Sequence, residues 1–290
     1  MPWIFVLIWS TGFVVARLAM PHAPPFGFLT LRFALSAGCF LIWIVIAGAQ
    51  WPKGRWQWFH LVVTGVLMQA AYLGGVWASV KAGLGAGTAA LLVGLQPVLT
   101  ALWLTRSAEA RGASAVVARQ WLGLVLGFAG IGLVVWRKLG GEVTAANLAM
   151  AIVALLGITI GTLYQKRFLS PCDVRTASAV QMAAAFVVCL PLALLESEPM
   201  DWHLNLVLAM AWSVGVLTLG GSSLLYLLIQ RGEATSVTSL LYLVPPCTAL
   251  MAWALFGESL TLLMMAGVAL TVFGVALVVR PVAKEKEKPT

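Results

Sequence analysis

The chain has 290 residues, of which 61% are apolar and only 10% are charged, whereas a soluble globular domain has about 45–50% and about 25%. This composition excludes a soluble globular protein, and the 13 Trp, 12 Phe and 4 Tyr exclude a disordered one. The net charge of +8 does not indicate a nucleic-acid partner here, because basic residues gather on the cytoplasmic loops of membrane proteins. We expect an all-α membrane protein whose surroundings are a lipid bilayer.

Long apolar runs, bounded by Pro, Gly and charged residues, recur along the whole chain. Each is about as long as a helix must be to cross a bilayer. An outer-membrane barrel would show alternating hydrophobicity instead. The sequence predicts ten membrane-spanning helices, at residues 3–19, 28–48, 59–80, 86–105, 119–136, 146–166, 176–195, 205–230, 234–256 and 259–280.

The distribution of Lys and Arg predicts the orientation of these helices, because the cytoplasmic side of a membrane protein is the more basic side. We expect both termini in the cytoplasm, and the protein in a bacterial inner membrane. The predicted cytoplasmic segments contain Lys53, Arg55, Arg106, Arg111, Arg119, Lys166, Arg167, Arg175, Arg231, Arg280, Lys284, Lys286 and Lys288. The opposite side contains only Arg17, Lys81, Arg137 and Lys138, together with the acidic residues Glu196, Glu198 and Asp201.

The two halves of the sequence resemble each other at one constant spacing. A spacing of 149 residues relates Trp77 to Tyr226, Gly83 to Gly232, Pro97 to Pro246 and Glu109 to Glu258. Five helices per half is an odd number, so the second half would be inserted in the opposite orientation. Inverted repeats are typical of secondary transporters. We expect a first repeat at residues 1–140, a second at 141–282 and a charged cytoplasmic tail at 283–290.

Several segments carry a family resemblance. They are Leu7 to Phe13, Leu31-Arg32-Phe33, Gly87 to Leu92 with Gln96-Pro97, Ala234 to Val237, Leu243 to Pro246, and Phe256 to Ser259. With them the chain resembles the EamA-type members of the drug/metabolite transporter superfamily, over nearly all of residues 1–280. The resemblance implies ten helices in two repeats, with a central cavity lined by the first, third, fourth, sixth, eighth and ninth helices.

Polar and aromatic side chains near the middle of the predicted spans are the candidates for substrate binding. Hydrocarbon penalises polar atoms unless they face a cavity or find a partner. Taken singly, each could serve helix packing alone. As a set, aromatic faces with a few hydrogen-bonding groups suit small organic molecules. The predicted substrate-binding residues are Trp9, Tyr72, Trp77, Gln96, Tyr226, Ser239 and Tyr242.

Pro97 and Pro246 occupy equivalent points in the fourth and ninth predicted helices. A proline inside a helix removes one backbone hydrogen bond and kinks the helix. Each could be a static kink, or the pair could be hinges about which the two halves move. Breaks at corresponding positions of two repeats point to the transport site.

No Asp, Glu or His lies in the middle of a predicted span, although proton-coupled transporters often place one there. This favours a neutral or zwitterionic cargo over an exchanged cation. Glu109 and Glu258 lie at helix ends, where capping or solvation is expected. We expect Arg32, about one turn inside the second helix, to extend to the outer headgroups; holding a substrate carboxylate is the alternative.

The sequence predicts a secondary transporter that exports small metabolites, with amino acids or related compounds suggested by the family resemblance. A lipid or polyprenyl-phosphate flippase of the same fold is an alternative. An intramembrane enzyme is a more distant one, because His22, His60 and His203 lie at membrane edges and form no catalytic arrangement. We expect no cofactor and no metal. A monomer suffices, although glycine-rich faces such as Gly123 with Gly127 leave a homodimer open.

Overall fold

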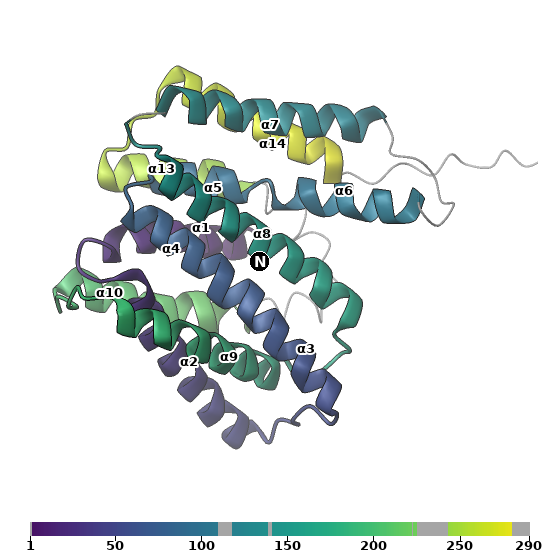
Figure 1. Cartoon of the computed structure of the whole chain (residues 1–290), viewed down its shortest axis with the longest axis vertical. Coiled ribbons are helices and arrows are strands. Elements are labelled where there is room, and N and C mark those ends of the chain that lie inside the picture. Colours follow the sequence, from purple (N-terminus) through teal and green to yellow (C-terminus); the bar gives the residue numbers. More distant parts are fainter. Residues whose placement is uncertain (1, 110–117, 139–140, 222, 225–242, 280–290) are drawn as a thin grey trace, which may run out of the picture.

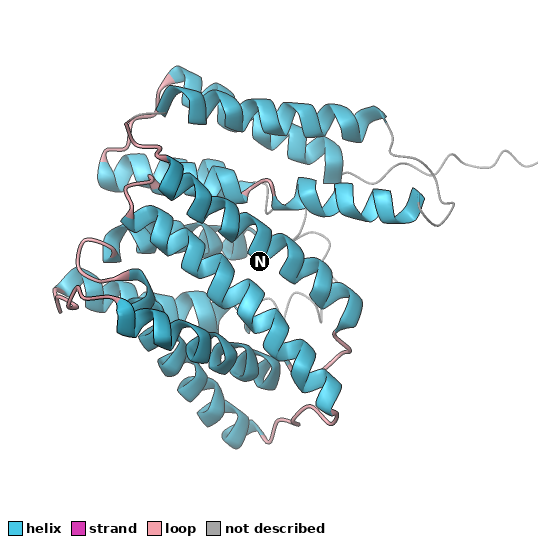
Figure 2. Ribbon diagram, viewed as in Figure 1, coloured by secondary structure: helices cyan, strands magenta, loops and turns pink. Residues whose placement is uncertain are grey.

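The computed structural model describes residues 2–109, 118–138, 141–221, 223–224 and 243–279. These residues form helices joined by short connections (Figures 1 and 2). The helices are α1 (Pro2–Ala19), α2 (Pro25–Ala47), α3 (Arg55–Gly65), α4 (Tyr72–Lys81), α5 (Ala86–Val93), α6 (Gln96–Glu109), α7 (Ala118–Lys138), α8 (Ala145–Phe168), α9 (Val174–Leu195), α10 (Leu204–Trp212), α13 (Val244–Phe256) and α14 (Leu262–Val279), with the π-helical segments η1 (Val66–Ala71) and η2 (Ser213–Gly220).

Each predicted membrane span overlaps an apolar helix of the structure. Four helices are long and apolar enough to cross a membrane, namely Pro25–Ala47, Arg55–Lys81, Ala145–Phe168 and Val174–Leu195. Shorter apolar helices cover Trp3–Ala19, Ala86–Thr100, Trp121–Trp136, Leu204–Gly220, Val244–Phe256 and Leu262–Leu277. Large apolar side chains such as Val45, Leu195 and Leu262 are exposed on the outside of the bundle. These features are those of an α-helical, multi-pass membrane protein.

Two helices contain π-helical segments at related positions. The segment η1 joins α3 to α4 within one continuous helix, and η2 continues α10. Residues 215–220 of η2 are related to the whole of η1 by the 149-residue spacing. π-helical turns are rare, and they occur frequently at functional sites.

The fourth predicted span is two helices rather than one. Helix α5 ends at Val93 and α6 begins at Gln96, so Pro97 lies in the first turn of α6, where the absence of an N–H has little effect. Pro246 likewise lies in the first turn of α13. The break after α5 lies against α13, because a Cβ atom added to Gly94 would lie 2.7 Å from Cγ of Pro245.

Helices of the two halves pack against each other. In Figure 1, α7 lies beside α14 at the top and α2 beside α9 at the bottom. Glycine permits the close approach of α7 and α14, since a Cβ atom on Gly130 or Gly274 would lie 2.5 Å from a backbone oxygen of the other helix. Gly123, whose carbonyl faces Gly274, therefore packs within the chain.

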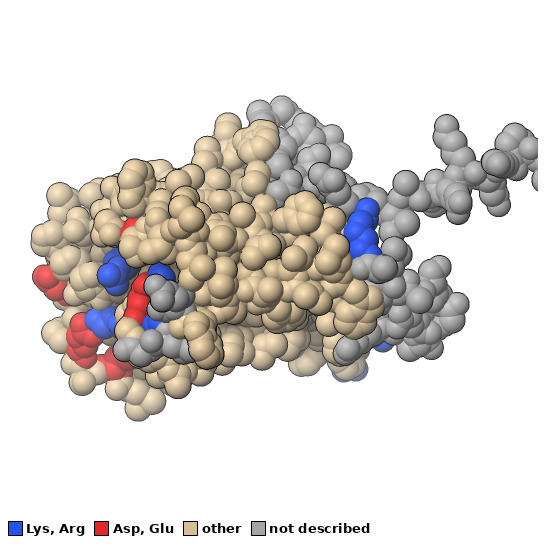
Figure 3. Space-filling view, turned by 90° about the horizontal axis from the view of Figure 1, so that it is seen from above, with Lys and Arg blue, Asp and Glu red and all other residues tan. Residues whose placement is uncertain are grey.

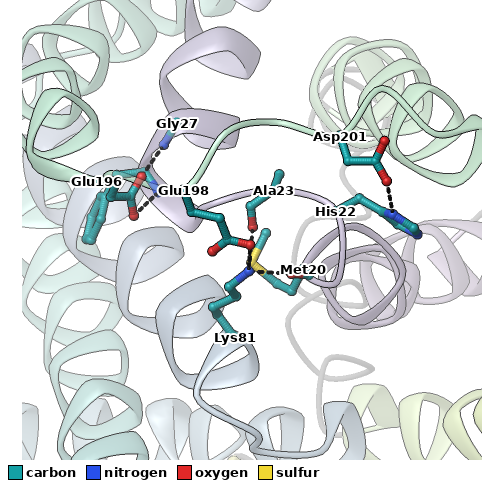
Figure 4. Close-up of polar contacts among 9 residues, drawn as sticks. Met20, His22, Ala23, Gly27, Lys81, Glu196, Glu198 and Asp201 are labelled. Carbon is teal, nitrogen blue, oxygen red and sulfur yellow. Dashed lines mark hydrogen bonds and ion pairs between the residues drawn. The ribbon is translucent and has the colours of Figure 1, made fainter.

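Polar contacts join several connections at one end of the bundle, which we call the Lys81 end (Figure 4). Lys81 forms an ion pair of 2.6 Å with Glu198 and donates to the carbonyl oxygen of Met20. The Glu196 carboxylate accepts hydrogen bonds from the N–H groups of Phe26 and Gly27 at the start of α2. The opposite end of the bundle contains the α8–α9 connection, residues 169–173, and is called the Pro171 end. Between the two ends, the face shown in Figure 3 is almost free of charged side chains.

Candidate functional site

A cavity of about 530 Å³ lies among α1, α2, η1, α4, α8, α9 and η2. It runs from Trp77, four residues before the end of α4, to residues 169–172 at the Pro171 end. Its volume is within the range of about 300–1,000 Å³ that is usual for small-molecule sites. Its aromatic and polar lining includes Trp9, Phe13, Arg32, Gln69, Tyr72, Trp77, Gln165, Lys166, Ser170, Ser178, Gln181 and Thr218.

Three predicted substrate-binding residues, Trp9, Tyr72 and Trp77, line this cavity together. The Trp77 ring is almost fully buried and stacks on Phe28 with ring centroids 4.4 Å apart. Tyr72 follows directly after η1 and lies close to both Trp9 and Arg32. The three side chains come from α1 and α4, and they provide aromatic faces at several points along the cavity.

No other predicted residue is among the described residues that line the cavity. Gln96 is not among the residues that line the cavity; its amide donates to the Thr162 hydroxyl at 3.4 Å and joins α6 to α8. Pro97 and Pro246 start helices, as described above. Tyr226, Ser239 and Tyr242 lie outside the described residues.

The expectation that Arg32 extends to the outer headgroups is wrong. Its side chain is only 6% exposed and lines the cavity. One guanidinium nitrogen donates to the Thr218 hydroxyl of η2 at 3.2 Å, and the group lies 6.0 Å from the centroid of the Trp77 ring. Helices α4 and η2 cover this face of α2, so the side chain is enclosed instead of reaching the surface.

Gln181 of α9 also lines the cavity, although it is not among the substrate-binding residues predicted from the sequence. The signal was present, because the 149-residue spacing relates Gln181 to Arg32. Both residues lie on the pair of helices, α2 and α9, that pack side by side. Two polar positions that the 149-residue spacing relates therefore line the same cavity.

At the Pro171 end, the cavity is lined by a thiol, Cys172, and an ion pair between Asp173 and Arg175 lies next to it in the chain. Hydrogen bonds from Arg175 hold the pKa of the Asp173 carboxyl below its usual value, and Asp173 caps the start of α9. Burial, together with the nearby charge of Asp173, raises the pKa of the Cys172 thiol above its usual value. Cys172 lines the cavity, so its reactivity can report on what fills the mouth.

Glu258 caps a helix, one of the two roles expected for it from its position at a helix end. Its carboxylate accepts hydrogen bonds from the backbone N–H groups of Ala86, at 2.9 Å, and Gly87, at 3.4 Å. It therefore caps the start of α5 from the connection that follows α13. The side chain of Glu109 lies outside the described residues. Among those that are described, no three His, Cys, Asp or Glu residues are grouped as metal ligands would be.

Comparison with known proteins agrees with the helical fold. An "Uncharacterized transporter YvbV" of Bacillus subtilis is 26% identical, over 94% of this chain and 88% of the relative. An "Uncharacterized inner membrane transporter YedA" of Escherichia coli is also 26% identical, over 94% and 87%. A "Probable amino-acid metabolite efflux pump" of Salmonella typhimurium is 24% identical, over 93% of each chain. A crystal structure with 18% identity superposes with a TM-score of 0.64, over 96% of this chain and 95% of the other, which supports the fold alone.

The apolar helices define a polytopic membrane protein, and the relatives are named as membrane transporters. The sequence model of the EamA-like transporter family matches residues 3–136 and again residues 146–280. The chain belongs to the EamA-like transporter family. These two relatives, from Bacillus subtilis and Escherichia coli, are named as transporters.

Proposed function

We propose that this protein is a secondary exporter of small amino acids or related metabolites, working by alternating access. The observation that carries the proposal is the cavity beside Trp9, Tyr72 and Trp77, enclosed by helices of both halves. Aromatic faces bind the apolar part of an organic molecule, and the amide side chains Gln69 and Gln181 offer hydrogen bonds. The printed name of the Salmonella relative, an amino-acid metabolite efflux pump, supports this class of cargo.

The proposed architecture is two inverted repeats of five spans each, at residues 1–140 and 141–282. Two separate matches to one family model support it. The related positions of η1 and η2, and the first-turn prolines Pro97 and Pro246, support it further. Irregular segments at equivalent points of two repeats can deform in the same way, which alternating access requires. We therefore keep Pro97 and Pro246 as the proposed hinges.

The proposed orientation places both termini and the Pro171 end in the cytoplasm of a bacterial cell. Basic residues such as Lys166 and Arg167 flank the cavity mouth there. At the Lys81 end, the ion pair between Lys81 and Glu198 and the cap of Glu196 on α2 join the connections. In this arrangement the cavity faces the cytoplasm, and polar contacts close the outer side.

A lipid or polyprenyl-phosphate flippase is the second candidate, and Arg32 inside the cavity is the observation in its favour. A flippase needs a basic group to carry an anionic headgroup across the membrane. The volume of about 530 Å³ favours the first candidate, because it suits one small molecule.

Flux measurements in proteoliposomes test the proposal. A mixed pool of radiolabelled amino acids and small amines is offered with a pH gradient and without one, beside vesicles that contain a fluorescent phospholipid. Saturable flux of a small molecule supports the exporter, and flux without a gradient indicates a facilitator. Movement of the phospholipid without any small-molecule flux would contradict the exporter and support the flippase.

A further inference from the structure

Arg32 is a buried charge whose compensation within the described part of the chain is incomplete. Its side chain is 6% exposed, and its Nε–H group has no hydrogen-bond partner there. Its neighbours there include the Thr218 hydroxyl, which accepts a hydrogen bond of 3.2 Å, the face of Trp77 at 6.0 Å, and Tyr72, whose phenol carries no charge at neutral pH. An arginine inside a membrane protein is costly and normally pairs with an opposite charge. Neither Thr218 nor Trp77 supplies one.

The charge of the described cavity lining has one sign. Arg32 and Lys166 line the cavity, and none of its described lining residues is Asp or Glu. Lys166 is exposed at the mouth, at the Pro171 end. Arg32 lies toward the other end of the cavity, seven residues and about 10 Å along α2 from its start at Pro25, which is at the Lys81 end. A cavity with this lining attracts an anion to the mouth and offers it a cation deeper inside.

The geometry around Arg32 favours a planar carboxylate. A guanidinium group carries five N–H donors in a plane, and it pairs with carboxylates through parallel hydrogen bonds. Thr218 occupies one terminal nitrogen. Trp77, which lies against the guanidinium group, and Trp9 provide aromatic faces for the remainder of the ligand. One guanidinium balances the single charge of one carboxylate.

We propose that Arg32 binds a carboxylate group of the cargo, so that this transporter selects small carboxylic acids, amino acids included, and rejects amines that lack the carboxylate. This inference rests on the proposed transport function. It makes Arg32 a residue that determines specificity rather than a structural link between α2 and η2.

Matched pairs of probes test the assignment. Each pair consists of an amino acid and the amine that remains without its carboxylate: leucine with isoamylamine, phenylalanine with phenethylamine, and tryptophan with tryptamine. Flux of each is measured in proteoliposomes for the wild type, Arg32→Gln and Arg32→Lys. Arg17→Gln is the matched control, because it removes a positive charge from a helix, α1, at a residue outside the cavity lining.

The wild type is expected to transport at least one amino acid and none of the amines. Arg32→Gln should raise the half-saturation concentration for that amino acid by about 10- to 100-fold, as the loss of a charge-assisted hydrogen bond implies. Arg32→Lys should retain part of the affinity, and Arg17→Gln all of it. Equal transport of both members of a pair, or unchanged affinity in Arg32→Gln, would overturn the inference and leave the proposed transport function standing. Absence of flux for every probe would overturn both.

The melting temperature of the purified protein separates binding from structure. If Arg32 serves binding, Arg32→Gln should melt at or above the wild-type temperature, because it removes a buried charge without a counter-charge. The amino acid that the wild type transports should raise the melting temperature of the wild type and not that of Arg32→Gln. A lower melting temperature for Arg32→Gln, with the ligand shift retained, would mean that Arg32 is structural.

Discussion

The carboxylate of Glu258 accepts a hydrogen bond of 2.9 Å from the backbone N–H of Ala86, so a residue of the second half caps a helix of the first. A helix N-terminus has unpaired N–H groups and a partial positive charge, and a carboxylate satisfies both. The contact ties the α13–α14 connection to the start of α5, at the same end of the bundle as Lys81. Glu196 makes the corresponding contact with the start of α2.

Removal of the Glu258 cap should lower stability. Glu258→Ala is expected to cost about 0.5–2 kcal/mol, the usual cost of losing an N-terminal cap, and thermal melting in detergent measures it. Glu198→Ala is the comparison, because its exposed ion pair with Lys81 is expected to contribute about 0–1 kcal/mol. A larger loss for Glu198→Ala than for Glu258→Ala would contradict this ranking.

Two glycines of α7, Gly130 and Gly132, should differ sharply in their tolerance of alanine. A Cβ atom on Gly130 would lie 2.5 Å from the carbonyl oxygen of Gly267, whereas one on Gly132 would meet nothing within 4 Å. Gly130→Ala should therefore cost about 1–3 kcal/mol through overpacking.

Gly132→Ala is the control on the same helix. It should be neutral or stabilising by up to about 1 kcal/mol, since alanine is the better helix former. Equal melting temperatures for the two variants would show that the helices are not packed as described.

The aromatic face of Trp77 should increase the affinity of the transporter for an aromatic cargo. Trp77→Phe keeps a ring against Phe28 but shortens the surface beside Arg32. We expect the half-saturation concentration of an aromatic cargo to rise by about 5- to 10-fold, in line with about 1 kcal/mol for a lost aromatic contact. Trp103→Phe, at an exposed position on α6, should leave it unchanged. Similar kinetics for both variants would exclude Trp77 from the binding surface.

Cys172 should react slowly with a maleimide at neutral pH, because burial and the charge of Asp173 raise the pKa of its thiol and the thiolate is the reactive form. Asp173→Asn removes the second cause, so it should lower the pKa of Cys172 and speed the reaction, while asparagine still caps α9. The rate is measured against pH in a variant with Cys39, Cys189 and Cys247 replaced by Ser. A transported compound should slow the reaction of Cys172. If neither the compound nor Asp173→Asn changed the rate, Cys172 would not lie at the cavity entrance that the cargo uses.

Long apolar runs were sufficient to predict that the described part of the chain consists of apolar helices, because the hydrocarbon core demands continuous apolar segments. The aromatic residues Trp9, Tyr72 and Trp77 were also predictable, since large polar-tipped rings inside a bundle need a cavity or a partner. The two halves of the fourth span were not separated in advance. The proline was visible, but the break lies at Gly94 and Leu95, just before it.

The depth of Arg32 was not predictable from its place in the sequence. Its distance from the helix end permits extension to the headgroups, and only the packing of α4 and η2 over α2 prevents this. The π-helical segments were equally hidden, because no residue type signals them. Gln96 shows the converse: a polar residue inside a span found its partner in Thr162 rather than in the cavity.

Counterflow tests the central claim, transport by alternating access, most directly. Proteoliposomes are loaded with an unlabelled amino acid that the protein carries, and entry of a trace of the same labelled amino acid is followed with no ion gradient. The account predicts that the label accumulates transiently above its equilibrium level, because loaded carriers return with cargo. Equilibration without any overshoot, at a rate independent of the internal amino acid, would contradict alternating access.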